Sequence, residues 1–347
     1  DTAAEPDPLT VYELGARPYC VRWSRDGSFL AVGDEDSRVH VLDADLQGAP
    51  RQVLNEDVTD LDALPTLALC WRPGAGPRGR SILVEGNCAG SVNHWHVPSC
   101  RRLHHIRQHG TEVYCIDYSR GAATFATGGK DAVVRIYEEA TKSLVMQMHG
   151  GAERSLQRGH VTQVFSVRYH DEDPQLLASG GWDRVVHTWD VRTGSSVATF
   201  SGPFVNGDCV DLHGNDVLAG SKGRSGQVQI FDLRRPGTEP ASTLSVHAGV
   251  ASEDAEVWTL YACRFSPDAQ RSLVAVGAGA AGSGDGKVVV FDRASGGVVL
   301  ERTFAGKSVY SVDFSPETAA GPQLAIVAGS RTESFAATLP LPGTEGG

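Results

Sequence analysis

The chain repeats a short alternation of apolar and polar residues that is typical of β-strands. Seven such runs, each ending in a turn sequence, start 43 to 53 residues apart: YCVRWSRDG (19–27), LALCWRPG (67–74), YCIDYSRG (114–121), FSVRYHDED (165–173), DCVDLHGN (208–215), YACRFSPD (261–268) and YSVDFSPE (310–317). Glycine, aspartate, asparagine and serine punctuate the segments that follow, as expected for tight turns between antiparallel strands. The pattern predicts an all-β chain built from similar units.

Each unit continues with a second apolar strand, a turn and a third strand with a recurrent ending. An aromatic or aliphatic residue closes the third strand and an acid usually follows, as in Leu42-Asp43, Trp95-His96, Tyr137-Glu138, Trp189-Asp190, Phe231-Asp232 and Phe291-Asp292. The seventh unit, around residues 325–340, lacks this ending. Units of this length with four strands each are typical of propeller blades.

On these endings the chain resembles the WD40 family over nearly all of its length. In that family a histidine, a serine or threonine, an aspartate and a tryptophan form a hydrogen-bonded tetrad within a blade. The fourth unit matches it with His160, Ser179, Asp183 and Trp189, and the third with His109, Thr127, Asp131 and Tyr137. The first unit is degenerate, with Val32, Asp36 and Leu42, and the second has Ala89 at the aspartate position.

The resemblance implies one domain over residues 1–347, an all-β, seven-bladed propeller of four-stranded antiparallel blades. We expect the blades at roughly 16–53, 64–106, 109–148, 160–200, 204–245, 257–304 and 307–340. The segment Thr10–Leu14 precedes the first repeat and has no unit of its own. We expect it to complete the last blade as an outer strand, which closes the ring and removes an exposed sheet edge.

Charge and cysteine usage narrow the function classes. The net charge is -11, and Lys and Arg nowhere form long clusters, so nucleic acid is not expected as a partner and a basic protein is favoured. No apolar run reaches the roughly 18 residues of a membrane span, and no signal peptide is expected. The 7 cysteines form no CxxC pair, which favours a reducing compartment. We expect a cytoplasmic protein, with the nucleus or a cilium as alternatives.

The chain contains serine, histidine and aspartate residues of the kinds that form catalytic sites, but their positions favour a structural role. Ser179 belongs to the middle of a strand, whereas a hydrolase needs an exposed serine beside an oxyanion hole. His94 and His96 lie two residues apart and could face one zinc ion, but two further ligands are missing at suitable spacing. We therefore expect no enzyme, no cofactor and no metal, and interpret the tetrad as structural.

The first residue of each repeated run is the main candidate for binding. In WD40 propellers this position lies on the narrower face of the ring, and here it reads Tyr19, Leu67, Tyr114, Phe165, Asp208, Tyr261 and Tyr310. Five of seven are aromatic in a chain with 7% aromatic residues. The rings either fill space between blades or line a channel mouth that accepts an aliphatic or cationic side chain, with Asp208 as its charge partner.

A second position, just before the tetrad aspartate, reaches the same face in the family. It reads Glu35, Cys88, Lys130 and Trp182 in the first four units, then Arg224 and Gly284. Trp182 either packs on a neighbouring turn or is covered by a partner. Two connections are acidic, with Glu56, Asp57, Asp60 and Asp62 in one and Glu253, Asp254 and Glu256 in the other. Together with the aromatic ring they favour a basic peptide.

The predicted function is a non-enzymatic scaffold that binds a protein or peptide containing Lys or Arg. We expect a monomeric subunit of a larger complex, with neither nucleic acid nor membrane as partner. One alternative is a substrate receptor of a cullin-4 ubiquitin ligase, because Leu177–Arg192 resembles the box that docks on the adaptor, through Asp190 and Arg192. The other is a structural subunit of a ciliary, trafficking or cytoskeletal assembly, which residues 150–159 could serve.

Overall fold

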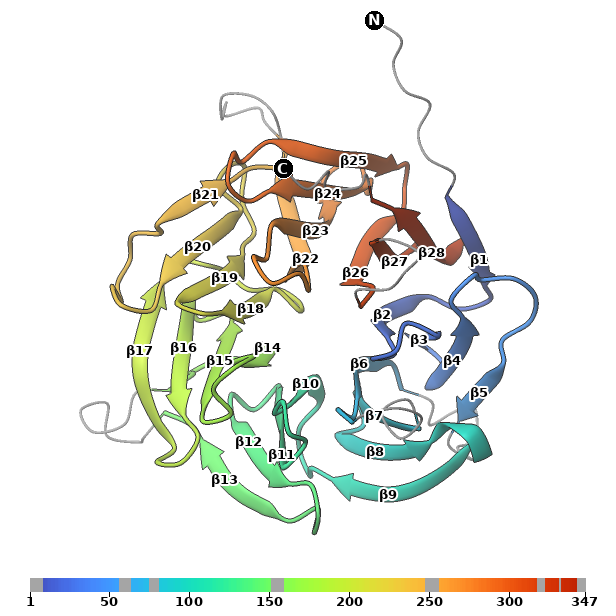
Figure 1. The fold of residues 1–347 in the computed structure, drawn as a ribbon, viewed down its shortest axis with the longest axis horizontal. Coiled ribbons are helices and arrows are strands. Elements are labelled where there is room, and N and C mark those ends of the chain that lie inside the picture. The colour runs from blue at the N-terminus through green and yellow to red at the C-terminus, as the bar shows by residue number, and fades with distance from the viewer. Residues whose placement is uncertain are drawn as a thin grey trace, which may run out of the picture.

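The short alternating segments pair into separate small sheets arranged around a central axis. The computed structural model describes residues 9–55, 64–74, 81–150, 159–246, 256–316, 322–330 and 332–341. Within these residues, strands β1 to β28 form seven four-stranded antiparallel sheets (Figure 1). The predicted seven-bladed propeller is confirmed. No helix in the described ranges has both the length and the apolar character that crossing a membrane requires.

In each of the first three blades, the four strands follow the order of the chain from the central channel to the outer rim. Blade 1 holds β2 (Pro18–Trp23), β3 (Phe29–Asp34), β4 (Arg38–Asp43) and β5 (Gln52–Asn55). Blade 2 holds β6 (Thr66–Trp71), β7 (Ile82–Asn87), β8 (Ser91–His96) and β9 (Arg101–Arg107). Blade 3 holds β10 (Val113–Tyr118), β11 (Thr124–Gly129), β12 (Val134–Glu138) and β13 (Leu144–Met148).

The next three blades follow the same order. Blade 4 holds β14 (Val164–Tyr169), β15 (Leu176–Gly181), β16 (Val185–Asp190) and β17 (Ser195–Ser201). Blade 5 holds β18 (Val210–His213), β19 (Asp216–Gly220), β20 (Val228–Asp232) and β21 (Ser242–Leu244). Blade 6 holds β22 (Trp258–Phe265), β23 (Leu273–Ala280), β24 (Gly286–Asp292) and β25 (Val298–Phe304).

Blade 7 closes the ring with strands from both ends of the described chain. It holds β26 (Ser308–Phe314), β27 (Gln323–Gly329), β28 (Ser334–Pro340) and β1 (Thr10–Leu14). Thr10 pairs with Thr338 and Leu14 with Ser334, so β1 is the outer strand of this sheet. The predicted closure by Thr10–Leu14 is confirmed, and it covers an edge of β28 that would otherwise be unpaired.

The hydrophobic core lies between neighbouring blades. Val21 and Leu30 of blade 1, for example, pack in one cluster with Ala325 and Val327 of blade 7. Because both faces of a blade are covered, the second strand of each blade is buried almost throughout, and every residue of β23 is buried. Full burial of a Val or Leu side chain contributes about 1.5–3 kcal/mol to stability. The turns and the channel are left for recognition.

Candidate functional site

The channel mouth is built by an irregularity that recurs at the start of the inner strands. In six blades the pairing of the inner strand shifts by one residue, between Pro18 and Cys20, Thr66 and Ala68, Val113 and Cys115, Val164 and Ser166, Leu260 and Ala262, and Val309 and Ser311. The skipped residues are Tyr19, Leu67, Tyr114, Phe165, Tyr261 and Tyr310. A β-bulge redirects a side chain from the sheet face. These six side chains therefore turn toward the channel.

One cavity of about 240 Å³ is lined by all seven predicted mouth residues, Tyr19, Leu67, Tyr114, Phe165, Asp208, Tyr261 and Tyr310. Each of them is half-buried rather than enclosed between blades. The cavity is smaller than the roughly 300–1,000 Å³ of drug-sized pockets. Its size suits one inserted side chain better than a whole small molecule. We call this opening the upper mouth.

The aromatic rings form two arcs around the upper mouth. In the first arc, Tyr310 lies between Tyr19 and Tyr261, with ring centroids 5.5 Å and 5.4 Å apart. In the second arc, Tyr114 stacks on Phe165 at 4.8 Å. Leu67 and Asp208 fill the two gaps, from blades 2 and 5. Contacts between rings hold each arc in place, while the cavity between the arcs stays open.

Trp182 extends the second arc outward onto the upper face. Its ring lies 5.1 Å from Phe165 and stacks on Phe204 at 5.8 Å. Its Nε1 donates a hydrogen bond of 2.7 Å to Oδ1 of Asn206. Trp182 thus packs on a neighbouring turn and is still 39% exposed. Neither Phe204 nor Asn206 stands at a repeated position, because both come from the connection before blade 5, so the repeat pattern does not predict them.

A short polar chain supports Tyr114 at the rim. The Tyr114 hydroxyl donates to Glu112 Oε2 at 2.9 Å, and Lys130 Nζ lies 2.6 Å from Glu112 Oε1. Burial opposes ionisation of Glu112, but the bonds from Lys130 and Tyr114 outweigh it and lower its pKa. Burial and the contact with Glu112 raise the pKa of Tyr114. Lys130, predicted as a partner-binding residue, thus lies at the rim with its charge paired.

The other predicted polar groups of this face divide between described and undescribed residues. Glu35 Oε1 accepts the backbone N–H of Arg17 at 3.0 Å, and Glu256 Oε1 accepts bonds from Ser283. The remaining acids of the two predicted acidic connections, Glu56, Asp57, Asp60, Asp62, Glu253 and Asp254, lie outside the described residues. So does most of the 150–159 connection.

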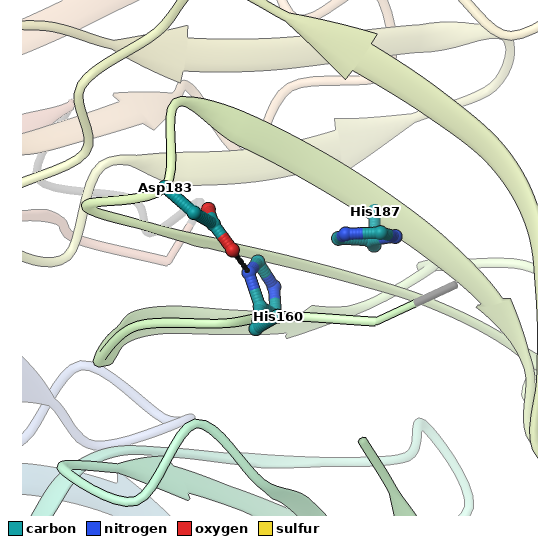
Figure 2. Close-up of side chains that lie close together, drawn as sticks. All are labelled: His160, Asp183 and His187. Carbon is teal, nitrogen blue, oxygen red and sulfur yellow. Dashed lines mark hydrogen bonds and ion pairs between the residues drawn. The ribbon is translucent and has the colours of Figure 1, made fainter. Parts of the chain in front are cut away.

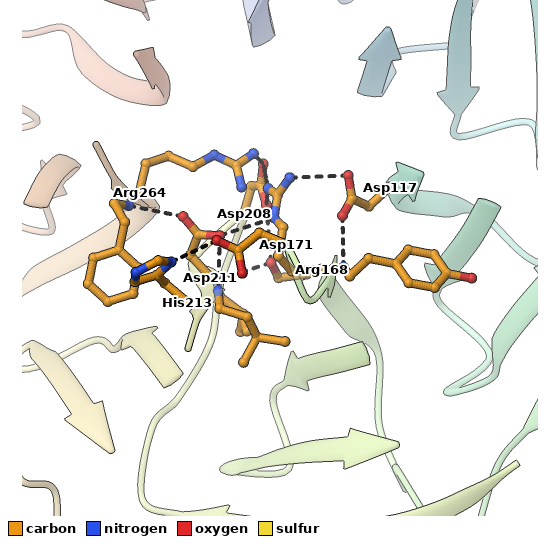
Figure 3. Close-up of polar contacts among 12 residues, drawn as sticks. Asp117, Arg168, Asp171, Asp208, Asp211, His213 and Arg264 are labelled. Atoms are coloured by element: carbon orange, nitrogen blue, oxygen red, sulfur yellow. Dashed lines mark hydrogen bonds and ion pairs between the residues drawn. The ribbon is translucent and has the colours of Figure 1, made fainter. Parts of the chain in front are cut away.

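The carboxylate of Asp208 lies at the floor of the upper mouth, where it accepts hydrogen bonds from other side chains of the same chain. It accepts them from Arg168 of blade 4 and Arg264 of blade 6 (Figure 3). Arg22 of blade 1 donates to the same carboxylate. The Arg168 Nη2 to Asp208 Oδ1 distance is 3.2 Å. We predicted Asp208 as the charge partner of an incoming cation. The structure corrects that role, because three guanidinium groups of the same chain already surround the carboxylate.

These arginines belong to a ring of charges that sequence reasoning missed. The residue three positions after each mouth residue reads Arg22, Cys70, Asp117, Arg168, Asp211, Arg264 and Asp313 around the channel. The three acids also accept backbone N–H groups of the next blade, from Tyr169, Phe265 and Trp23. Burial raises the pKa of Asp211 and Asp313, and nearby arginines partly oppose this rise. All seven residues of this ring line a second cavity of about 610 Å³.

The tetrad of blade 4 is a closed hydrogen-bond network. His160 Nδ1 lies 2.8 Å from Asp183 Oδ2, and His160 Nε2 lies 2.7 Å from Ser179 Oγ. Trp189 Nε1 donates to the same Ser179 oxygen at 2.7 Å. Burial opposes ionisation of Asp183, but the bond with His160 lowers its pKa. Ser179 is fully buried, so its hydroxyl cannot reach a substrate.

His187 approaches this network and completes a group with metal-ligand chemistry. One ligand atom each of His160, Asp183 and His187 lies within 4.8 Å of the others (Figure 2). Both ring nitrogens of His160 are already committed to Asp183 and Ser179. His187 Nδ1 bonds Ser196 Oγ at 3.0 Å. A metal ion would have to break the network that holds the blade, so the geometry favours structure over metal binding.

Blades 2 and 3 keep a similar network with other residues than those predicted. In blade 3, Gln108 Nε2 donates to Thr127 Oγ1 at 2.9 Å, while His109 is exposed. The assignment of His109 was therefore wrong by one residue. In blade 2 the Trp95 indole donates to Glu85 at 2.7 Å. Trp95 and Glu85 thus take the places of Trp189 and Ser179.

The turn acid of blades 1 and 2 also differs from the prediction. Asp34 Oδ1 accepts the backbone N–H groups of Asp36 and Arg38, each at 2.9 Å. Asn87 Oδ1 accepts those of Ala89 and Ser91. The polar cap of the turn thus lies two residues before the predicted positions, Asp36 and Ala89.

Asp190 and Arg192, the predicted adaptor contacts, form a local turn at the opposite end of blade 4. Asp190 Oδ1 accepts the Arg192 N–H at 2.9 Å, and Arg192 Nη2 lies 3.2 Å from Asp190 Oδ2. Asp232 and Arg234 repeat this arrangement in blade 5. The turn accounts for both residues locally, and adaptor docking stays a prediction.

His96, which the sequence pairs with His94 as a possible zinc ligand, forms a hydrogen bond of 2.7 Å between its Nδ1 and the Ser99 hydroxyl.

Comparison with known proteins finds one matching repeat family and several curated proteins of similar sequence. The family model "WD domain, G-beta repeat" matches residues 10–43, 100–138 and 152–190. "WD repeat-containing protein slp1" of Schizosaccharomyces pombe is 27% identical over 52% of this chain and 33% of its own length. "Guanine nucleotide-binding protein subunit beta" of Nicotiana tabacum is 26% identical, covering 51% and 49%. "COMPASS component SWD3" of Saccharomyces cerevisiae is 25% identical, covering 54% and 53%. The chain thus spans a third to about half of these relatives.

Proposed function

We propose, from the premise that this chain carries WD40 repeats in a seven-bladed propeller, that it binds a protein partner by accepting one partner side chain at the upper mouth. The observation that carries the proposal is the bulge shared by six inner strands, which turns five aromatic rings and Leu67 toward one cavity. If the rings only filled space between blades, they would not leave a cavity of about 240 Å³ open between them. The half-buried rings offer apolar faces to a long side chain.

The inserted residue is Lys or Arg. Ring faces attract cations, and the exposed face of Trp182 gives the strongest such contact. Around the floor, four carboxylates (Asp117, Asp208, Asp211 and Asp313) face three guanidinium groups (Arg22, Arg168 and Arg264). The floor therefore carries no excess of positive charge that would repel the ligand. The net charge of -11 steers a basic partner toward the protein.

The partner is a protein and the role is that of a subunit in an assembly. WD40 propellers are in general interaction scaffolds, and two relatives are a "subunit" and a "component" by name. In this chain the Ser, His and Asp of blade 4 satisfy one another inside the blade, which supports a binding role without catalysis.

The test uses short peptides of glycine and serine that carry one central Lys, Arg, Leu or Glu. Fluorescence polarisation with the full chain should show binding of the Lys or Arg peptide and none of the Glu peptide. Phe165→Ala and Trp182→Ala should each weaken that binding about 2- to 30-fold, because each removes a ring face worth about 0.5–2 kcal/mol.

Val197→Ala is the matched control, since Val197 is an exposed side chain on β17 away from the mouth. Circular dichroism of each variant verifies the fold. Wild-type affinity in both folded ring variants would refute the site. Preference for the Leu peptide would keep the site and refute the cationic ligand.

A further inference from the structure

Two buried thiols lie next to each other at the interface between blades 5 and 6. Cys209 precedes β18 and Cys263 lies in β22, and both side chains are fully buried and free. Asp208 pairs there with Ala262 in parallel, and the Cys263 N–H donates to the Asp208 carbonyl at 3.1 Å. Paired segments lie about 4.7–4.9 Å apart. A cysteine comes next on each segment, so their Cα separation fits the roughly 4.4–6.8 Å of disulfides.

The two sulfur atoms point toward the same place. A Cβ atom at Gly220 of β19 would lie 2.5 Å from Cys263 Sγ and 3.1 Å from Cys209 Sγ, so the glycine leaves room for both thiols. Burial raises the pKa of Cys209 well above its ordinary value, and the neighbouring Cys263 thiol raises it further. One thiol affects the pKa of another only at short range. The pair therefore has both the backbone and the side-chain arrangement that a disulfide needs.

Two other cysteines at the same repeat position have a different neighbour. Cys20 and Cys115, like Cys209, are the second residue of a repeated run. Cys20 Sγ donates to the Thr66 carbonyl at 3.6 Å, and Cys115 Sγ donates to the Val164 carbonyl at 3.7 Å. In each case the acceptor belongs to the next blade. For Cys209 the next blade supplies a second thiol, which makes oxidation chemistry available at this interface.

We propose that Cys209 and Cys263 form a disulfide in the presence of a hydroperoxide, which links blades 5 and 6 covalently. One thiolate attacks the peroxide and becomes a sulfenic acid, while the O–O bond breaks and hydroxide leaves. The second sulfur then displaces the sulfenic oxygen, which leaves as hydroxide, and the S–S bond forms. Each hydroxide takes up one thiol proton. Two thiols and one hydrogen peroxide thus give one disulfide and two waters.

Burial controls the rate of this reaction. The thiolate is the reacting form of a cysteine, and the low polarity around Cys209 disfavours it. Because both side chains are fully buried in the closed ring, peroxide reaches them only when the interface between blades 5 and 6 opens locally. The disulfide therefore accumulates when an oxidant and a cause of local opening, such as heat, act together.

The test treats the full chain with hydrogen peroxide and maps its cysteines by tryptic digestion and mass spectrometry. Cys209 and Cys263 are the single cysteines of the tryptic peptides 193–222 and 235–264. These two peptides should appear as one linked species that dithiothreitol separates. Urea below the unfolding transition should raise the rate of linkage at least about fivefold, because it favours local opening.

Two variants separate this pair from oxidation in general. Cys263→Ala should abolish the linked species, whereas Cys115→Ala, at the same repeat position as Cys209, should leave it unchanged. The oxidised wild type should melt several degrees above the reduced protein, because a cross-link restricts the unfolded chain. Oxidised and reduced Cys263→Ala should melt within about one degree of each other. Circular dichroism verifies that each variant is folded.

Absence of the linked peptides, or linkage of Cys209 to another cysteine, would refute the pair. Equal rates of linkage with and without urea would refute control by local opening. A lower melting midpoint of the oxidised wild type would show that the bond strains the ring, and it would overturn the proposal. Phe165→Ala, which acts at the upper mouth, should form the disulfide as the wild type does, so the two proposals fail independently.

Discussion

Ser179 connects two residues that are far apart in the sequence of blade 4. Its hydroxyl lies 2.7 Å from both His160 Nε2 and Trp189 Nε1, and the side chain is fully buried. The sequence predicted these residues because the spacing of the repeat places them together. It could not predict that Gln108 replaces His109 in blade 3, since both residue types can donate and only the backbone decides which one turns inward.

Replacing Ser179 with alanine should destabilise the protein by about 2–4 kcal/mol. The change leaves His160 and Trp189 each with a buried polar atom lacking its partner, and each such atom costs about 1–3 kcal/mol. Urea unfolding followed by tryptophan fluorescence measures the loss. Ser195→Ala, at an exposed residue of the same blade, should change stability by less than about 0.5 kcal/mol. Equal stability of the two variants would contradict the network's role.

At the level of strands, the alternation of apolar residues predicted the inner runs and the seven mouth positions, but not the bulges. An alternation of apolar and polar residues does not show where a bulge adds one residue to a strand. The prediction that Tyr19 and Phe165 point toward the channel therefore depended on the family resemblance alone. The polar residues that cap the turns of blades 1 and 2 were misplaced for a related reason, because the repeat alignment does not show where the second strand ends. Asp34 and Asn87 occupy the strand end where blades 3 and 4 have Gly129 and Gly181.

Gly181 shows how tightly the inner and second strands approach at this point. A Cβ atom there would lie 2.0 Å from the carbonyl oxygen of Gln163. Gly181→Ala should therefore lower stability by about 1–3 kcal/mol, through a forced backbone shift beside Trp182. Gly121→Ala is the control, because a Cβ at Gly121 meets nothing within 4 Å. Thermal denaturation should separate the two variants, and equal midpoints would show that the strands can move apart without cost.

Across the whole molecule, charges in the channel link blades that share no sheet. Asp208 of blade 5 contacts Arg22, Arg168 and Arg264, and Asp313 of blade 7 holds a backbone N–H of blade 1. The alternation of Arg and Asp is visible in the sequence once the repeats are aligned. The contact across the channel is not, because it depends on the diameter of the closed ring.

Asp208→Asn should cost about 3–5 kcal/mol, because it leaves three clustered guanidinium groups without their shared counter-ion. Asp45→Asn, at an exposed turn of blade 1, serves as the matched charge change and should be nearly neutral. Chemical unfolding of both variants measures the difference. A stable Asp208→Asn protein would mean that Asp117, Asp211 and Asp313 suffice to balance the arginines.

The pairing of Thr10 with Thr338 sets an order on biosynthesis. A ribosome that adds about 5–20 residues per second needs roughly 15–65 seconds to go from one partner to the other. During this time β1 has no strand to pair with, so the backbone N–H and C=O groups that β28 will bond stay unpaired. Contacts at such sequence separation also form slowly after release. Blade 7 is accordingly the last blade to assemble, and the edge of β1 stays open to other strands until β28 emerges.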